Sequence, residues 1–386
     1  MSAAENTVAK TSGGKRTGAG LRGQSAGETA IATVGKEGSG LTYRGYSIET
    51  LAENANFEEV AYLLLYEGLP TASQLKAYKT KLKGLRGLPQ ALKDVLERVP
   101  RDTHPMDVMR TGCSMLGTLE PETDFTQEHD IADRLLAVFP SIMCYWYRFA
   151  SDGARIETET DDQSIAGHLL HMLHGKSPSR LHERAMNVSL ILYAEHEFNA
   201  STFACRVCAA TLSDFYSAVT AGIGTLRGPL HGGANEAAMA LIEQFDTPKQ
   251  ARAGVLEMLV RKEKIMGFGH AVYRESDPRN AVIRSWSKQV SEATGDTQLY
   301  DISEAIEKLM WDEKKLFANL DFYSASTYHM MGVPTELFTP TFVVSRITGW
   351  AAHIMEQRAN NVLIRPGADY TGPENQEWIP IEARGA

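Results

Sequence analysis

The sequence contains few cysteines, no long apolar run and no excess of basic residues. Four cysteines in 386 residues include one C-x-x-C pair, and no second pair completes a zinc site. No run of about 18 apolar residues is present that could span a membrane. The formal net charge of −9 argues against general nucleic-acid binding, which requires a basic face. An anionic ligand would therefore need a local pocket of positive charge.

The first forty residues lack the apolar core of a secretory signal. They are rich in glycine and basic residues, which predicts a flexible arm over residues 1–38. Glu5 and the glycines also argue against a mitochondrial presequence, which is amphipathic and poor in acidic residues. The few cysteines indicate a reducing compartment, so we expect the protein in the cytoplasm.

Most of the chain has the apolar periodicity of helices. FEEVAYLLLYEGLP predicts an amphipathic helix, and Thr71 and Gln74 form a capping-box signal at the start of the next one. A long apolar helix over DIADRLLAVFPSIMCYWYRFA is expected to bend or begin afresh at Pro140. Strand-like pieces occur only around TAIATVG and LTYRGYSI. The predicted fold class is therefore all-α, with minor β structure near the N-terminus.

Two clusters of potential metal ligands have simpler interpretations. Cys205 and Cys208 lie in the apolar run ASTFACRVCAATLSDFYSAV, which predicts a helix with small buried thiols. HLLHMLHG predicts a helix that ends at Gly175, with histidines near its negative end. We therefore predict no metal site, and elemental analysis would test the alternative of a metal-binding protein.

The first candidate catalytic group is His231, in the segment GPLHGGANEA. Gly228 and Pro229 break the preceding element, and ANEAAMALIEQF predicts a helix directly after the turn. The positive end of that helix disfavours an imidazolium. A neutral imidazole can donate a hydrogen bond to a carbonyl oxygen as negative charge develops on it. The alternative is a histidine that only caps the turn.

A second histidine, His270, follows Gly267 and Gly269 in GFGHAVYRESDPR. The glycines allow a ligand to approach the backbone, and their amides are potential donors. Downstream, Arg274 and Arg279 can recognise carboxylate or phosphate through a planar fork. The segment lacks the third glycine and the preceding strand of a dinucleotide fingerprint. A solvated charged loop is the alternative interpretation.

Asp321, in NLDFYSAS, stands at the start of a predicted helix over FYSASTYHMM. An ionised carboxylate is favoured at that position and can act as a general base. The alternative is an aspartate that only caps the helix. Two histidines in tight turns and one aspartate form a set of proton-transfer groups, which suits carbon–carbon bond chemistry on an anionic substrate.

These segments together resemble the citrate synthase family. The motifs LHGGANE, GFGHAVYRESDPR, NLDFYSAS, SRITGW and RPGADYTGP occur in the family's order and approximate spacing. GLTYRGY and EHEFNASTFACRV extend the likeness upstream, so it runs from about Gly40 to the C-terminus. The resemblance implies a two-domain all-α fold. A large helical domain would comprise residues 39–222 and 330–386, and a smaller inserted helical domain residues 223–329.

The resemblance also implies a mechanism. Asp321 would take a proton from the carbon next to an acyl-CoA thioester, and His231 would hydrogen-bond the thioester oxygen and stabilise the enol. The enol would attack the keto carbon of oxaloacetate, and His270 would protonate the alkoxide. Hydrolysis would then release CoA and a tricarboxylate. No metal or other cofactor is needed, because hydrogen bonds and arginine charge stabilise the developing oxyanions.

Substrate-binding residues follow from the same likeness. His196 would contact the keto oxygen of oxaloacetate, and Arg279, Arg346 and Arg365 would bind its carboxylates. Arg365 would reach into the partner subunit, which implies a homodimer with shared active sites. Closure of the two domains on oxaloacetate would exclude water. The residues implied for CoA binding are Met266, Gly267, Phe268, Gly269, Arg274 and Lys314.

Within the family, MMGVPTELFTP, GWAAHIMEQR and RPGADYTGPENQEWIPIEAR resemble the 2-methylcitrate synthase branch. That likeness implies condensation of propionyl-CoA with oxaloacetate. One methylene in an apolar pocket is worth about 1–3 kcal/mol, so side activity on acetyl-CoA is expected. An ordinary citrate synthase that uses acetyl-CoA is the first alternative. The intact set of His231, His270 and Asp321 argues against a non-catalytic sensor of CoA or metabolites.

Overall fold

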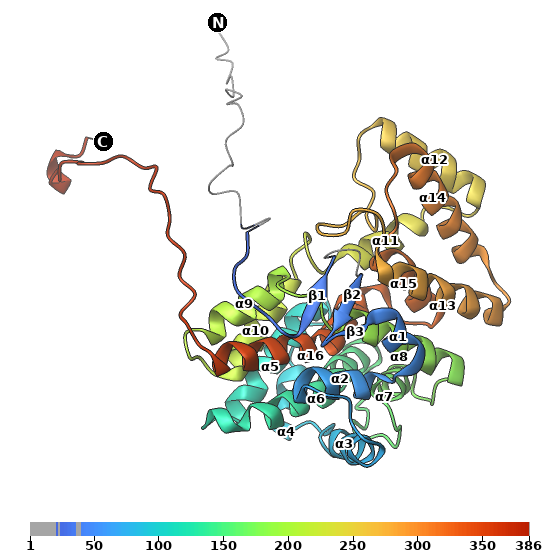
Figure 1. Ribbon diagram of the computed structural model, residues 1–386, viewed down its shortest axis with the longest axis horizontal. Coiled ribbons are helices and arrows are strands. Elements are labelled where there is room, and N and C mark those ends of the chain that lie inside the picture. Colours follow the sequence, from blue (N-terminus) through green and yellow to red (C-terminus); the bar gives the residue numbers. More distant parts are fainter. Residues whose placement is uncertain (1–20, 22–23, 36–39, 386) are drawn as a thin grey trace, which may run out of the picture. The chain divides into compact units, whose positions relative to one another are not determined.

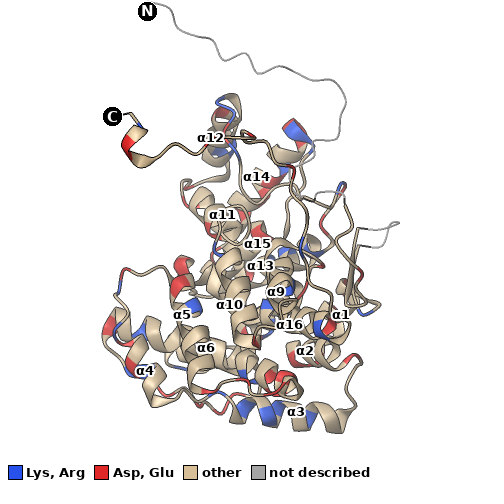
Figure 2. Ribbon diagram, turned by 90° about the vertical axis from the view of Figure 1, so that its left-hand side faces the viewer, with Lys and Arg blue, Asp and Glu red and all other residues tan. Residues whose placement is uncertain are grey.

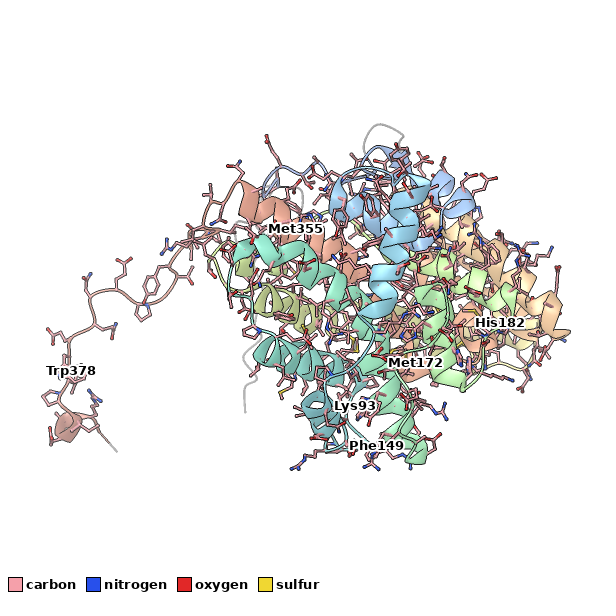
Figure 3. All side chains as sticks on the ribbon, turned by 90° about the horizontal axis from the view of Figure 1, so that it is seen from below. Lys93, Phe149, Met172, His182, Met355 and Trp378 are labelled. Atoms are coloured by element: carbon pink, nitrogen blue, oxygen red, sulfur yellow. The ribbon has the colours of Figure 1, made fainter. Side chains whose placement is uncertain are left out.

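The computed structural model describes residues 21, 24–35 and 40–385 of the 386-residue chain. The chain divides into two units. One is Thr29–Leu363, and it holds nearly all the regular structure. The other comprises Met1–Glu28 and Ile364–Ala386. Its described part contains one short 3-10 helix, η3 (Ile381–Ala383), and exposed apolar side chains such as Trp378, which is labelled in Figure 3.

Helices build most of the unit Thr29–Leu363, as Figure 1 shows. Two short 3-10 helices, η1 (Phe125–Gln127) and η2 (Thr335–Leu337), accompany them. This composition confirms the predicted all-α class. The α-helices in chain order are α1 (Ile48–Asn54), α2 (Phe57–Tyr66), α3 (Ala72–Gly84), α4 (Gln90–Leu96), α5 (Pro105–Leu119), α6 (Glu128–Asp152), α7 (Ile165–His174), α8 (Arg180–Tyr193), α9 (Ala200–Ala209), α10 (Phe215–Leu226), α11 (Ala234–Ile242), α12 (Pro248–Val260), α13 (Pro278–Thr294), α14 (Gln298–Lys314), α15 (Leu320–Met330) and α16 (Phe338–Ala359).

A small antiparallel sheet precedes the helices, as the sequence predicted. Its strands, β1 (Ala32–Val34), β2 (Leu41–Tyr43) and β3 (Tyr46–Ser47), pair in the order β1-β2-β3. β1 falls inside the span expected to be a flexible arm, residues 1–38. Ile31 is fully buried and β1 pairs with β2, so the arm does not include this strand. Residues 1–20, 22–23 and 36–38 of that span lie outside the described residues.

Helix α16 occupies the centre of the helical body. It packs against α6 and α9, and further against α2, α8 and α10. Most of its side chains are buried, including Phe342, Arg346 and Trp350. A helix that is buried on all sides is expected to be apolar all round. The buried Arg346 departs from that rule and therefore needs a partner or a function.

Helices α11 to α15, drawn from yellow to orange, gather on one side of Figure 1. Within this group α11 and α13 pack against α15, and α12 packs against α14. Helix α10 packs instead against α5 and α9. Both ends of the expected inserted domain, residues 223–329, fall inside helices: the last turn of α10 and the last turn of α15. The turn that carries His231 connects α10 to α11, where the chain passes from one helical group to the other, whereas Asp321 lies in the first turn of α15.

Several local predictions are confirmed. Thr71 and Gln74 form the predicted capping box at the start of α3. Helix α7 ends at Gly175, whose φ of 70° is the left-handed value that glycine adopts without strain. Helix α6 runs through Pro140 without a break, so of the two predicted outcomes the fresh helix start was wrong, whereas the bend stays a prediction. Its packing against α16, α5 and α7 compensates for the hydrogen bond that proline removes.

The cysteine-bearing run forms two helices, α9 and α10, where the sequence predicted one. Leu212 adopts a positive φ of 65° between them, and Asp214 caps the start of α10. Cys205 is buried as predicted, whereas Cys208 is only half-buried. All four cysteines are free thiols. Over the described ranges, no group of three or more His, Cys, Asp or Glu residues could hold a metal ion, and no helix is long and apolar enough to cross a membrane.

Candidate active site

His231 lies in the turn before α11, and its ring points to the start of another helix. The backbone N–H of Ser201, in the first turn of α9, donates to Nε2 of His231 at 3.3 Å. The Ser201 hydroxyl lies 2.9 Å from the same nitrogen and accepts a hydrogen bond from the Trp350 indole at 3.0 Å. Because Nε2 accepts from a backbone donor, the ring proton resides on Nδ1. Nδ1 is therefore the atom that can donate to a substrate.

Burial, with a contribution from the Arg346 guanidinium, lowers the pKa of His231 to about 4. The imidazole is therefore neutral near pH 7, as the sequence predicted. The predicted cause was the positive end of the following helix. The structure shows instead that the ring contacts the N-terminus of α9, thirty residues earlier in the chain. The contact with α9 also excludes the simpler interpretation of a histidine that only caps its own turn.

The glycine loop before His270 is held by backbone hydrogen bonds. Gly267 and Gly269 adopt positive φ angles of 86° and 72°, which explains the two glycines. The carbonyl of Gly267 accepts from the N–H of Asn319 at 2.9 Å. The N–H of Gly269 donates to the carbonyl of Phe317 at 2.8 Å. The amide of Gly269 is therefore already used, contrary to the expectation that it would be a free donor.

Three aromatic side chains meet beside that loop. The His196 and His270 ring centroids lie 5.0 Å apart, and the Tyr273 hydroxyl is 3.1 Å from Nε2 of His196. Nδ1 of His270 accepts from the N–H groups of Val272 and Tyr273, at 3.1 Å and 3.3 Å. The proton of a neutral His270 therefore resides on Nε2.

Both of these histidines are held in the neutral state. Burial and the Arg279 guanidinium lower the pKa of His270 to about 4. Burial is also the main cause that places the pKa of His196 well below its usual value, followed by Arg279 and His270 itself. A neutral His270 with its proton on Nε2 can donate a hydrogen bond without carrying charge.

Two buried arginines supply positive charge to the same region. Arg279 donates to both carboxylate oxygens of Asp277 and is 6% exposed. Arg346 is 2% exposed, and its Nε donates to the carbonyl of Tyr193 at 2.8 Å. Among the described residues no carboxylate lies within ion-pair distance of Arg346. Figure 2 shows Lys and Arg spread over many elements, including α3 and α12. A buried cation without a direct ion-pair partner can bind an anionic ligand.

Asp321 is the second residue of α15. The N-cap is Asn319, whose side-chain oxygen accepts from the N–H of Asp321 at 3.1 Å, so Asp321 itself is not the cap. The hydroxyl of Tyr193 donates to Oδ1 of Asp321 at 2.7 Å. Burial raises the pKa of Asp321, against the opposing effects of the Tyr193 hydrogen bond and the nearby arginines. A carboxylate with a raised pKa is a stronger base than an exposed one.

Phe342 connects these groups across α16. Its ring lies 4.5 Å from the ring of Tyr193 and 6.5 Å from that of His231, and the guanidinium of Arg346 lies 4.6 Å from its centroid. Tyr193, which bonds Asp321, therefore lies around the same aromatic side chain as His231 and Arg346. A neutral donor, a buried carboxylate and buried cations in one region can enolise and condense carbonyl compounds that carry carboxylates.

Known proteins resemble this chain over almost its whole length. The family described as citrate synthase, C-terminal domain, matches residues 20–367. A 2-methylcitrate synthase from Shewanella oneidensis is 68% identical over 370 residues, which are 96% of this chain and 99% of that protein. The chain belongs to the citrate synthase family. The family resemblance inferred from the sequence motifs is thereby confirmed.

Two other similar proteins are named as citrate synthases. Citrate synthase 2 of Bacillus subtilis is 45% identical over 348 residues, covering 89% of this chain and 93% of that protein. The citrate synthase of Thermoplasma acidophilum was solved as a ternary complex with carboxymethyl coenzyme A and oxaloacetate. It matches this chain with a TM-score of 0.88 at 30% identity, over 94% of this chain and 98% of that one. The citrate synthase fold expected from the sequence is therefore confirmed.

The structure brings together six of the residues that the family resemblance singled out. The unit Thr29–Leu363 holds them around Phe342 and the glycine loop, and Met266, Gly267, Phe268 and Gly269 form that loop. The Phe268 ring packs 4.6 Å from the ring of Phe322, next to Asp321 in α15. The six residues are His196, His231, His270, Arg279, Asp321 and Arg346.

Three other expected ligands are exposed. Arg274 is exposed in the loop after His270, and Lys314 is exposed at the last position of α14. Arg365 is exposed and belongs to the C-terminal part of the second unit. Within the unit Thr29–Leu363, Arg274 and Lys314 are therefore not buried with Arg279 and Arg346.

Sequence reasoning missed two residues that touch the site. Tyr193 and Tyr273 each hydrogen-bond a candidate catalytic or substrate-binding group. Tyr193 stands three residues before His196 in the motif LYAEHEF, and Tyr273 stands three after His270. Proximity to the motif histidines was the signal that could have identified them.

Proposed function

We propose that the protein is a 2-methylcitrate synthase, which condenses propionyl-CoA with oxaloacetate and hydrolyses the product thioester to 2-methylcitrate and CoA. The observation that carries the chemistry is the buried, unpaired guanidinium of Arg346 beside Asp321 and two neutral histidines. The choice of propionyl-CoA rests on the 68% identity to the Shewanella oneidensis 2-methylcitrate synthase.

Oxaloacetate binds first in this proposal. Arg279 and Arg346 take its carboxylates, because guanidinium groups bind carboxylates in a planar, bidentate manner. His196 contacts the keto oxygen. His270 presents its Nε2–H to that oxygen and stabilises the negative charge that develops there, since its Nδ1 is occupied by two backbone donors.

The acyl-CoA is then activated between His231 and Asp321. Asp321 takes a proton from the carbon next to the thioester, through Oδ2, because Oδ1 is held by Tyr193. The Nδ1–H of His231 donates to the thioester oxygen and stabilises the enol. The enol carbon attacks the keto carbon of oxaloacetate, and the electron pair of the C=O π bond moves onto the keto oxygen. The Nε2–H of His270 then protonates the resulting alkoxide. Water then hydrolyses the thioester and releases CoA.

The CoA moiety is assigned to the exposed side of the site. The loop Met266–Gly269, with Phe268 at its centre, provides backbone contacts, and Arg274 and Lys314 provide charge for the phosphates. The chemistry uses general acid–base groups and fixed cations, and the proposal includes neither a metal nor an organic cofactor.

A direct assay separates the two acyl groups. CoA release from oxaloacetate is measured with propionyl-CoA and with acetyl-CoA, and the two kcat/KM values are compared. A higher value for propionyl-CoA supports the proposal. A higher value for acetyl-CoA makes the protein a citrate synthase, and no release with either would favour a CoA or metabolite sensor. One methylene is worth about 1–3 kcal/mol, so the ratio is expected between about 10 and 200.

We also propose a cytoplasmic homodimer whose active sites are shared. Arg365, in the exposed C-terminal segment, would then bind oxaloacetate in the partner's site. An Arg365→Ala chain mixed with a His270→Ala chain should regain activity, because one hybrid site carries neither substitution. Each variant mixed with itself is the control. No recovery after proven subunit exchange would refute the shared site.

The inserted domain, residues 223–329, is proposed to close on oxaloacetate. It carries His231 and His270, whereas His196 and Arg346 belong to the larger domain. Closure would bring the two sets together around the substrate and exclude water. Small-angle scattering should show a smaller radius of gyration with oxaloacetate, and an unchanged radius would argue against closure.

A further inference from the structure

Tyr193 makes a side-chain contact with the proposed base. It is the last residue of α8 and is 2% exposed. Its hydroxyl lies 2.7 Å from Oδ1 of Asp321 and 2.6 Å from the hydroxyl of Ser324, one turn later in α15. Ser324 donates its own proton to the carbonyl of Leu320 at 2.8 Å. The single proton of Tyr193 therefore has two acceptors, Asp321 and Ser324.

The phenol is fixed in place and stays protonated. Burial, followed by the negative charge of Asp321, raises the pKa of Tyr193 well above its usual value. The ring packs against Phe342 at 4.5 Å. The backbone carbonyl of the same residue accepts the Nε–H of Arg346. Tyr193 thus contacts the carboxylate through its side chain and an oxaloacetate-binding arginine through its backbone.

We propose that Tyr193 is the positioning residue of the general base: its hydroxyl holds Oδ1 of Asp321 and leaves Oδ2 to take the substrate proton. Among the described residues, Oδ2 accepts no hydrogen bond. A carboxylate that is fixed at one oxygen presents the other in a defined direction, which is the condition for efficient proton transfer. This inference rests on the proposed condensation of an acyl-CoA with oxaloacetate.

Other charged groups face Asp321 and remain when the tyrosine is changed. Arg279 and Asp277 come from the start of α13, and Arg346 comes from α16. The arginines favour the ionised carboxylate, and Asp277 disfavours it. The Tyr193 hydroxyl adds to the arginine effect, because it donates to the charged form. Its removal should raise the pKa of Asp321.

The test is Tyr193→Phe in the full-length enzyme, with kcat/KM measured against pH. The loss of a hydrogen bond to a charged group should reduce kcat about 10- to 100-fold near neutral pH. The acidic limb of the profile should move to higher pH, because Asp321 then protonates more readily. The KM for oxaloacetate should stay close to wild type, since the backbone carbonyl that holds Arg346 is retained.

Tyr328→Phe is the matched control. Tyr328 is also buried, and its hydroxyl pairs with Ser189 at 2.6 Å, across the same two helices. This control should leave the acidic limb in place. If Tyr193→Phe also leaves the limb in place, or loses no more activity than Tyr328→Phe, Tyr193 contributes packing only and the proposal is overturned.

Ser324→Ala provides an independent second test. Removal of the serine hydroxyl leaves Asp321 as the remaining acceptor of the Tyr193 proton, so the acidic limb should move to lower pH, opposite to Tyr193→Phe. A limb unchanged in Ser324→Ala would count against the shared proton even if Tyr193→Phe failed to fold. The wild-type assay separates the two proposals: no CoA release from wild type refutes the function, whereas an active wild type with unshifted variants refutes only the role of Tyr193.

Discussion

Arg279 donates two hydrogen bonds to Asp277, from Nε at 2.9 Å and from Nη2 at 2.8 Å, in a pair that is almost fully buried. The same carboxylate accepts the backbone N–H of Leu320 at 3.0 Å. Leu320 begins the helix that carries Asp321. One buried carboxylate therefore fixes both Arg279, the proposed oxaloacetate ligand, and the start of the helix that carries Asp321, the proposed base.

Asp277→Asn should therefore lower both stability and substrate affinity. Removal of one charge from a buried pair leaves the other uncompensated, which costs about 3–5 kcal/mol in the free energy of unfolding. Denaturant unfolding measures this change, and the KM for oxaloacetate should rise because Arg279 loses its orientation. Glu304→Gln breaks the half-exposed pair with Arg284 and should change stability by about 1 kcal/mol or less. Equal losses in the two variants would contradict the prediction.

The buried histidines make stability depend on pH. The folded-state pKa of His270 is about 4, below the unfolded value of about 6.5. The unfolded state thus binds more protons between these values, so the stabilisation is complete above pH 6.5 and is lost as pH falls toward 4. The free energy of unfolding should fall over this window, and less steeply in His270→Gln. An equally steep fall in the variant would show that His270 is not held neutral.

The neutral His231 should matter for catalysis far more than for folding. Loss of one preorganised donor to a developing oxyanion typically costs about 10²–10³ in kcat. His231→Ala should show a loss of this size, with nearly unchanged binding of oxaloacetate. His182→Ala, a half-buried histidine of α8 that is labelled in Figure 3, should retain wild-type turnover. A loss of less than about tenfold in His231→Ala would argue against a direct role for its Nδ1–H.

Local sequence patterns predicted the parts of the structure that depend on neighbouring residues. The capping box at Thr71 and the helix end at Gly175 follow from a few adjacent side chains, and both are confirmed. The split between α9 and α10 was missed, because the apolar run has no glycine or proline there. A leucine with positive φ and an aspartate cap form that break. Leucine is rare in the left-handed region, so its positive φ leaves no sequence signal.

The candidate site was predictable as a list of residues but not as a set of contacts. Motifs singled out His231 and Asp321 as candidate proton-transfer groups. Their partners come from distant segments: Ser201 is 30 residues from His231, and Tyr193 is 128 residues from Asp321. Contacts over such separations depend on the packing of α8, α9 and α15, which no local pattern encodes. The tautomer of each histidine could therefore be assigned only from the structure.

Gly349, in the motif SRITGW, should tolerate no side chain. It lies on α16 where that helix crosses the segment that carries His196. An added Cβ would lie 2.1 Å from a carboxylate oxygen of Glu195 and 2.6 Å from the carbonyl of Ala194, closer than real Cβ contacts. Glu195 is fully buried and bonds His353 at 2.8 Å, so it has little freedom to move. Gly349→Ala should therefore destabilise the protein by about 1–3 kcal/mol or more.

The matched variant is Gly224→Ala, in the exposed part of α10, where an added Cβ meets no atom within 4 Å. Alanine is the better helix former, so this change should raise stability by about 0.4–1 kcal/mol. Urea unfolding of both variants distinguishes a steric clash from a general effect of glycine replacement. Because Glu195 adjoins His196, Gly349→Ala should also raise the KM for oxaloacetate. A stable Gly349→Ala variant with normal kinetics would contradict this prediction. It would mean that α16 and the segment that carries His196 can move apart without loss of stability or of oxaloacetate binding.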